Sequence, residues 1–117
     1  MEPNNITTAK QLLKSEESAI VLFTHGPHFE IKQDGTGSSG HWQIDPDMEC
    51  DRVIVYYRKG QTNEIYLGNF INTKNAPDRK RQIILFNQMK HVGESKSNWY
   101  EFANGGQNPA QTVFGDE

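Results

Sequence analysis

Residues 50–73 read CDRVIVYYRKGQTNEIYLGNFINT and carry the strongest structural signal in the chain. Hydrophobic side chains of the first run fall on both faces: Val53, Val55 and Tyr57 on one, Ile54 and Tyr56 on the other. A polar loop containing Gly60 follows, and residues 64–71 alternate again. Two β-branched and aromatic runs joined by such a loop predict a β-hairpin. Because its first strand is apolar on both faces, we expect that strand to be central and covered on each side.

Further strands are predicted before and after this hairpin. Residues 18–24 (SAIVLFT) form a continuous apolar run, which predicts a buried strand. Residues 28–33 alternate, with Phe29 and Ile31 expected to point inward. The remaining short strands are expected at residues 41–44, 82–90 and 99–102, with an edge strand at 111–114. The glycine-rich residues 34–40 and the polar residues 72–81 are expected to be loops.

A short helix is predicted near the start of the chain. Thr8 and Gln11 match a capping box, with Thr8 as the N-cap of a helix over residues 9–15. Many short strands separated by turn signals indicate a mainly β (α+β) fold: a small curved sheet or pseudo-barrel of five to seven strands. A chain of 117 residues predicts one domain over residues 1–117.

Composition favours a soluble cytoplasmic protein. No apolar run approaches the roughly 20 residues that a membrane-spanning helix needs. The first residues lack the basic and apolar regions of a secretory signal. Cys50 is the single cysteine, so the chain has no internal disulfide framework, as is typical of a reducing compartment.

The formal net charge of -3 conceals an uneven distribution. Residues 1–51 carry three lysines against nine acidic residues, whereas residues 72–100 carry six basic residues against two acidic ones. Partners respond to local potential rather than to net charge, so a basic zone remains available on this acidic protein.

Metal and cofactor chemistry find little support in the sequence. The acidic series from Asp45 resembles the start of a calcium-binding loop, but Cys50 and Tyr56 stand where that loop needs glycine and a bidentate glutamate. Of four histidines only His25 and His28 are closely spaced, and Gly26-Pro27 separates them. No phosphate-binding loop is present, since GTGSSG lacks a following lysine and helix. We expect neither a metal site nor a cofactor.

Two catalytic interpretations, a nuclease and a cysteine nucleophile, are considered. The alternatives are that the nuclease residues lie in a solvated loop and that the thiol is unreactive. Pro77-Asp78 followed by Glu94 and Lys96 has the spacing of a Mg²⁺-dependent nuclease pattern, but residues 91–98 look like a loop rather than a rigid strand. Cys50 beside His41 is the only nucleophile pair, and neighbouring acids are expected to raise the pKa of Cys50. No sequence feature therefore requires that the protein be an enzyme.

A binding interpretation fits the aromatic residues better. The large aromatics are Trp42, Tyr56, Tyr57, Trp99 and Tyr100, and their polar companions are His41, Gln43, Arg58, Asn69 and Asn98. Each aromatic taken singly suits a core position, but together with amide neighbours they suit a pocket that stacks and reads a base. The basic loop residues Lys74, Arg79, Lys80 and Arg81 form either a solvated loop or a contact to a nucleic-acid backbone.

Part of the chain resembles the PUA-like superfamily, especially its EVE and ASCH branches. The resemblance covers residues 41–72, through HWQIDP, DRVIVYY and EIYLG, with Trp99-Tyr100 as a later match. It implies a pseudo-barrel that binds RNA or DNA, often at a modified or flipped base. By position Trp42 would line the pocket, Tyr57 would lie near its floor, Trp99 would form a wall and Asn69 would read a base edge. Cys50 stands where the family has glycine.

Three functions follow as hypotheses. The first is a nucleic-acid or nucleotide binding module. Its ligand-binding residues would be His41, Trp42, Tyr57, Asn69 and Trp99, and the basic loop would contact the phosphate backbone of the nucleic acid. The second is a protein-interaction or inhibitor domain, whose acidic residues 1–51, including Asp45, Asp47 and Asp51, imitate nucleic acid toward a basic partner such as a host or defence enzyme. The third is a small Mg²⁺-dependent nuclease using Asp78, Glu94 and Lys96. Strand pairing at residues 111–114 would support a homodimer.

Overall fold

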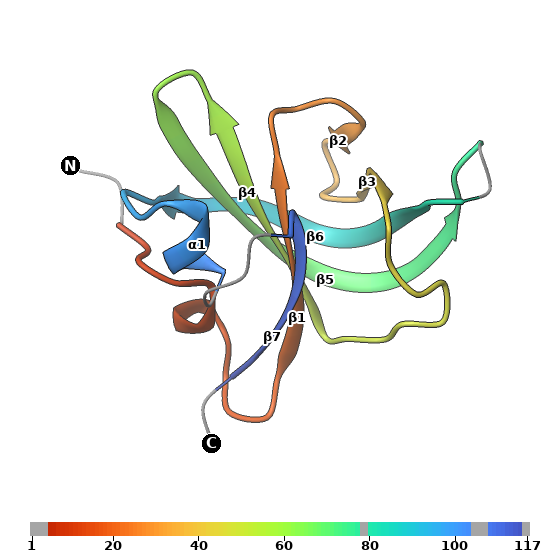
Figure 1. Ribbon diagram of the computed structural model, residues 1–117, viewed down its shortest axis with the longest axis horizontal. Helices are drawn as coiled ribbons and strands as arrows, with labels where there is room; N and C mark the ends of the chain where they lie inside the picture. The colour runs from red at the N-terminus through yellow and green to blue at the C-terminus, as the bar shows by residue number, and fades with distance from the viewer. Residues whose placement is uncertain (1–4, 78–79, 104–107, 116–117) are drawn as a thin grey trace.

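Seven strands form one mixed sheet in the computed structural model, which describes residues 5–77, 80–103 and 108–115. The strand order is β2-β3-β6-β5-β4-β1-β7 (Figure 1). The strands are β1 (Ser18–Thr24), β2 (Phe29–Ile31), β3 (Gly37–Trp42), β4 (Arg52–Lys59), β5 (Thr62–Asn75), β6 (Gln82–Glu94) and β7 (Ala110–Phe114). The helices are the 3-10 turn η1 (Ala9–Leu12) and α1 (Trp99–Phe102). The mainly β prediction is confirmed.

The predicted hairpin is the centre of the sheet. β4 and β5 pair antiparallel from Lys59 opposite Thr62 to Arg52 opposite Asn69. Only Gly60 and Gln61 lie between the paired ends, and Gly60 has a φ of 64°, a conformation that glycine adopts without strain. The strands therefore extend further into the polar loop than their hydrophobic pattern indicates.

β4 lies between two other strands, as its two apolar faces predict. β5 pairs with one side of it, and β1 pairs with the other side in parallel. β1 in turn pairs antiparallel with β7, which is an edge strand as expected. Segments far apart in the sequence thus meet at β1.

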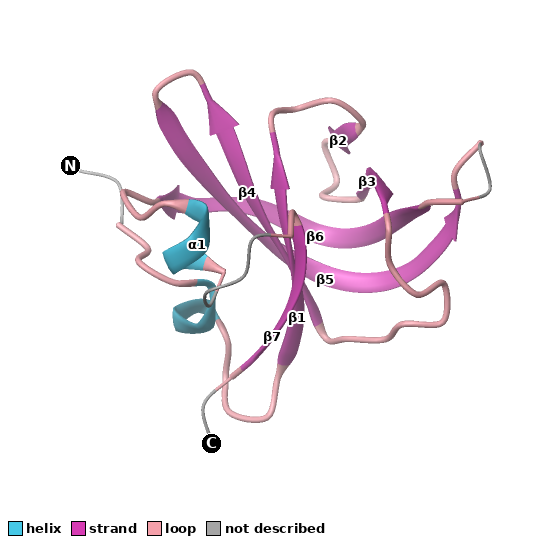
Figure 2. Cartoon of the chain, viewed as in Figure 1, coloured by secondary structure: helices cyan, strands magenta, loops and turns pink. Residues whose placement is uncertain are grey.

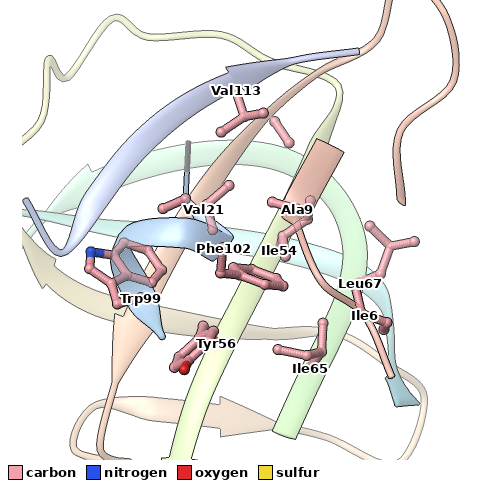
Figure 3. Packing of buried hydrophobic residues seen from close by; sticks show 12 residues of the cluster. Ile6, Ala9, Val21, Ile54, Tyr56, Ile65, Leu67, Trp99, Phe102 and Val113 are labelled. Atoms are coloured by element: carbon pink, nitrogen blue, oxygen red, sulfur yellow. The ribbon is translucent and has the colours of Figure 1, made fainter. Parts of the chain in front are cut away.

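Each face of β4 is packed against a separate hydrophobic cluster. On the face here called the α1 face, Ile54 and Tyr56 pack with Trp99 and Phe102 of α1, and Ala9 of η1 joins them (Figure 3). On the opposite β3 face, the cluster contains Trp42, Val53, Val55, Ile84 and Phe86. Figure 2 shows both short helices on the same side of the sheet, so the β3 face is covered by the sheet itself.

The sheet curves strongly but does not close. β2 and β7 are its two edges, and in the described part of the chain they do not pair with each other. The curved sheet is therefore the observed alternative, and the closed pseudo-barrel is not formed. Register irregularities between β5 and β6, at Leu67/Asn69 and Phe70/Asn72, increase the bend of these long strands.

Three expected loops contain strand instead, the shortest overlap being at residues 91–98, where β6 continues to Glu94. Residues 34–40 were expected to be a flexible loop, but β3 begins at Gly37 and pairs with β2 and β6. A side chain at Gly37 would collide with the carbonyl oxygen of Glu30, so this glycine permits a close strand approach. Residues 72–81 were likewise expected to be a loop, but β5 continues to Asn75. Ile31 was expected to point into the core, but it lies on the edge strand β2 and is 38% exposed.

The helices also differ from expectation. Residues 99–102 form α1 rather than a strand, because the side chain of Asn98 accepts a hydrogen bond from the backbone N–H of Glu101 (2.8 Å) and caps the helix. Near the start, Thr8 makes no capping bond; Thr7 donates to the side chain of Gln11 instead, and only a 3-10 turn forms. Neither described helix has the length and apolarity needed to cross a membrane.

Candidate ligand-binding site

A hollow of about 320 Å³ lies where the curved sheet brings β3 opposite β7. We call it the seam hollow, and its lining residues are His41, Trp42, Gln43, Arg81, Asn108, Pro109 and Ala110. They come from the end of β3 and the residue after it, from the residue before β6, and from the start of β7 and the two residues before it. Three residues predicted from the sequence, His41, Trp42 and Arg81, therefore meet at one place although up to 40 positions separate them.

Trp42 forms an apolar wall of the seam hollow. Its side chain is buried in the β3-face cluster, and its indole N–H donates a hydrogen bond to Oγ of Ser39 (3.1 Å). The indole N–H is thus already satisfied. Trp42 therefore belongs to the core and also lines the hollow. A ligand there can pack against its apolar ring surface, because the indole N–H is already hydrogen-bonded.

His41 gives the hollow a flat aromatic rim. Its ring is stacked on that of His28, with centroids 4.1 Å apart and an angle of 20° between the planes. His41 is half-buried and His28 is exposed. The mutual stacking holds the His41 ring in place, so a planar group could stack or pack beside it without first ordering the side chain.

The remaining lining of the seam hollow is polar and basic. Gln43 and Asn108 are exposed and contribute amide groups, each able to donate and accept hydrogen bonds. Arg81 is exposed and contributes a guanidinium, and Lys80 precedes it in the chain. No aspartate or glutamate is among the lining residues that the structure describes. The hollow combines a planar surface, amides and positive charge, a combination suited to a base and a phosphate.

The other predicted ligand-binding residues do not line the seam hollow. Tyr57 packs edge-on against Phe29, with ring centroids 5.8 Å apart, beneath β2. Asn69 pairs with Arg52 and lines a different hollow near Gln88. Trp99 lies on the α1 face. The structure thus distributes the predicted aromatics over both faces of the sheet instead of gathering them in one pocket.

The predicted basic loop is only partly described. Lys74 is exposed, but it belongs to β5 rather than to a loop. Lys80 and Arg81 are exposed beside the start of β6. Arg79 lies outside the described residues.

Trp99 lines a further hollow of about 330 Å³. We call it the Trp99 hollow. Phe23 and His25 at the end of β1 form one side of it, and Arg58 and Lys96 contribute positive charge. Sequence reasoning placed Trp99 and Arg58 among the aromatic and polar candidates, considered His25 only as a metal ligand and Lys96 only as a nuclease residue, and missed Phe23. No local signal marks Phe23 for this site, because only the pairing of β1 with β4 brings it beside Tyr56.

The proposed nuclease residues are not assembled by the described part of the chain. Asp78 lies outside it, and the preceding Pro77 follows the end of β5 that pairs with Gln82. Glu94 is at the other end of β6, a 13-residue strand that spans about 40 Å at the usual rise. Among the described residues no three histidine, cysteine or acidic side chains are grouped to hold a metal ion.

Glu94 instead belongs to a local polar cluster. It lies opposite Glu64, whose Oε1 is 2.8 Å from Nε2 of His91. Burial opposes ionisation of Glu64, but hydrogen bonds with Thr62, His91 and Glu94 outweigh it and hold its pKa below the ordinary value. The cluster links β5 to β6, which is a structural role.

Cys50 is a poor nucleophile. Burial, with a smaller contribution from the charge of Asp51, raises the pKa of its thiol to about 11. The predicted direction is therefore confirmed, but the main cause is burial rather than the neighbouring acids. Its Sγ lies 3.3 Å from the carbonyl oxygen of Arg52, which accepts its hydrogen bond.

The acidic turn is partly engaged in local structure. Oδ1 of Asp45 accepts a hydrogen bond from the backbone N–H of Asp47 (2.8 Å). Oδ2 of Asp51 accepts one from the backbone N–H of Ser18 (2.9 Å) and ties the turn to β1. These carboxylates shape the entry into β4, in keeping with the interpretation of a solvated turn.

Comparison of the chain with protein-family models, with curated proteins and with solved structures found no match.

Proposed function

We propose that the protein is a nucleic-acid or nucleotide binding module and that the seam hollow receives one nucleotide. The carrying observation is the meeting of His41, Trp42 and Arg81 with two amide side chains in one hollow, whose described lining residues include no carboxylate. A volume of about 320 Å³ is at the lower end of small-molecule sites. The hollow therefore suits one base rather than a larger cofactor.

Each lining group has a role in this proposal. The rim formed by His41 packs against the face or edge of the base, and Trp42 excludes water from its far side. Gln43 and Asn108 hydrogen-bond to the edge of the base, since each amide both donates and accepts. Arg81, supported by Lys80, binds the phosphate at the mouth. The described lining residues offer groups that stack on, hydrogen-bond to and neutralise a ligand, so the proposed activity is binding.

A fluorescence titration tests the proposal. Trp99→Phe leaves Trp42 as the only tryptophan, so the emission reports on the seam hollow. Thymidylate, uridylate, short single-stranded DNA and RNA, and modified nucleotides would be added at about 50 mM and about 200 mM salt. We expect one ligand class to change the Trp42 emission, with weaker binding at higher salt because phosphate contacts release counterions.

Two substitutions provide the controls. Arg81→Ala should weaken binding about tenfold or more at low salt and reduce the salt dependence, while the melting temperature stays close to that of the parent protein. Lys14→Ala removes an exposed positive charge that lines neither hollow, and it should leave binding unchanged. Binding that Arg81→Ala and His41→Ala both leave intact would overturn the assignment to the seam hollow.

A further inference from the structure

The Trp99 hollow repeats the chemistry of the seam hollow. Arg58, Lys96 and His25 line it together with the aromatic residues Phe23 and Trp99, and none of its described lining residues is acidic. Among the described residues neither Arg58 nor Lys96 forms an ion pair. Arg58 and Lys96 thus place two positive charges beside aromatic rings in one hollow, an arrangement suited to an anionic ligand.

Arg58 is held in position by its neighbours. One guanidinium nitrogen donates to Oδ1 of Asn63 (2.8 Å), and Nδ2 of the buried Asn63 donates to the carbonyl oxygen of Ser95 (2.9 Å). This chain of hydrogen bonds fixes one side of the guanidinium. Its remaining N–H groups are left for a planar or tetrahedral anion, and little side-chain entropy is lost when that anion binds.

The aromatic floor of the Trp99 hollow is equally well ordered. The half-buried ring of Phe23 contacts those of His25, Tyr56 and Trp99, with centroid distances of 5.1, 5.3 and 5.3 Å. The hydroxyl of Tyr56 donates to the carbonyl oxygen of Ser97 (2.6 Å). Phe23 and His25 thus form a fixed aromatic surface at the end of β1, next to the positive charges. Such a surface can stack any base, because every base has a π-face.

The two hollows share a border. Asn108 and Pro109 line the seam hollow, and the carbonyl oxygen of Asn108 accepts a hydrogen bond from the indole N–H of Trp99 (2.9 Å). The carbonyl oxygen of Pro109 accepts one from the backbone N–H of Phe23 (2.8 Å). Asn108 and Pro109 therefore separate the two hollows and contact a wall of each, so one short chain can reach both.

From this arrangement we infer that the ligand is a single strand of nucleic acid, with successive nucleotides in the two hollows and its backbone crossing Asn108 and Pro109. The inference rests on the proposed function of the seam hollow and extends it to a ligand of at least two nucleotides. In a single strand the bases are free to turn into separate hollows, whereas paired bases in a duplex are not. Arg58 and Lys96 bind the second phosphate.

The length of the ligand tests this inference. Affinities would be measured by isothermal titration for thymidylate and for thymidine oligonucleotides of two, four and eight units, with the uridine series in parallel. We expect affinity to rise about tenfold or more between one unit and the longer strands, because a second base stacks and a second phosphate is bound. A length series without any rise would overturn the inference but leave the proposed function standing.

Substitutions in the Trp99 hollow test whether this hollow causes the rise in affinity with strand length. Arg58→Ala and Lys96→Ala should remove most of the gain for the longer strands and leave thymidylate binding unchanged. Each should also reduce the slope of log affinity against log salt by about 0.7 for every phosphate that the variant no longer neutralises. Lys14→Ala is the matched control for Lys96→Ala, since both remove an exposed lysine. A gain with length that persists in both Arg58→Ala and Lys96→Ala would overturn the inference.

A spectroscopic readout separates the two hollows directly. Protein labelled with 5-fluorotryptophan gives one ¹⁹F resonance for Trp42 and one for Trp99, which the Trp99→Phe protein assigns. Thymidylate should shift only the Trp42 resonance, while strands of two or more units should shift both. Failure of every ligand to shift either resonance or to bind in the titration would overturn the proposed function itself, which distinguishes that result from a failure of the inference alone.

Discussion

The two faces of β4 are covered in different ways. Residues outside the sheet cover the α1 face, chiefly Ala9 from η1 and Trp99 and Phe102 from α1. The β3 face is covered by the sheet itself, since β3 and β6 curve over Val53 and Val55 and bring Trp42 and Phe86 onto them. One central strand is thus buried by separate segments on one side and by its own sheet on the other.

The difference explains where the hollows lie. On the β3 face the sheet curves but does not close, so the gap between β3 and β7 becomes the seam hollow. On the α1 face the four-residue helix covers only part of the sheet, and the ends of β1 and β4 remain beside it as the Trp99 hollow. Each hollow is therefore a consequence of incomplete coverage, and each has a tryptophan at its border.

The largest expected effects come from the buried phenylalanines of the two faces. Phe102 and Phe86 are 0% and 1% exposed, so Phe102→Ala and Phe86→Ala should each lower the free energy of unfolding by about 3–5 kcal/mol. Urea denaturation measures both losses. If the faces are independent, the milder pair Phe102→Leu and Phe86→Leu should be additive to within about 0.5 kcal/mol. A double variant that departs further from the sum would show that the faces are coupled through β4.

A smaller effect is expected from Gly37→Ala, which acts on the β3 face alone. The added methyl group would meet the carbonyl oxygen of Glu30 and the ring of Phe86, so β2 and β3 must separate. We expect a loss of about 1–3 kcal/mol and greater solvent exposure of Trp42, measured by acrylamide quenching in the Trp99→Phe background. The neighbouring Ser38→Ala is the control, and a Gly37→Ala protein as stable as this control would contradict the close approach of the strands.

The corresponding substitution on the α1 face is Asn98→Ala. It removes the cap on α1, so it should cost about 1 kcal/mol of stability and increase the quenching of Trp99 but not of Trp42. The Trp42→Phe and Trp99→Phe proteins separate the two signals. Asn98→Asp keeps an acceptor at the cap and should restore most of the loss; equal losses in both variants would argue against capping as the cause.

The smallest effect concerns Cys50, which packs beside the β3 face. Because its pKa is raised from 9.0 to about 11 in the folded protein, the thiolate at pH 8 is about 100-fold scarcer than in the unfolded chain. Ellman's reagent should therefore react much more slowly with native protein than with protein in urea. Equal rates would contradict the burial of the thiol.

The same shift predicts a dependence of stability on pH. A folded-state pKa above the unfolded value means that the neutral thiol is favoured by folding, so its contribution is fully present below pH 9 and is lost as the pH rises toward 11. Tyr56 and Tyr66 act in the same direction, since burial raises the pKa of each phenol. Cys50→Ala should consequently lose less stability between pH 9 and pH 11 than the parent protein, but it should not lose all of the dependence.

The parts of the fold that could be predicted are those in which the pattern of hydrophobic side chains reflects burial. The apolar run of residues 18–24 and the alternation in β4 mark buried strands, and both were located correctly. Only the end of β3 was predicted, and its residues 37–40 were missed because glycines carry no side chain to show a strand pattern. Gly37 is explained only by the close approach of the Glu30 carbonyl. α1 was missed because four residues are too few for helical periodicity, although the capping pattern of Asn98 and Glu101 was present.

The candidate site was predictable to a similar degree. Aromatic and basic residues in a binding interpretation drew attention to His41, Trp42 and Arg81, which the structure brings together. The role of Trp99 depends on α1, which turns it onto Tyr56 on the other face. Phe23 became visible only once β1 was paired with β4, since nothing local in the sequence indicates a parallel neighbour, whereas Lys96 was named only as a nuclease residue.

The position of β1 also has a consequence for the order of folding. β4, β5 and β6 are joined by short connections and can form early, whereas β1 must pair with β4 about 33 residues away and with β7 about 92 residues away. We therefore expect a transition state that contains the β4–β6 meander but not β7, so that Val113→Ala mainly accelerates unfolding. Asn108 and Pro109, which border both hollows, precede β7 directly. If the proposed function holds, the capacity to bind a ligand is therefore acquired in the last step of folding.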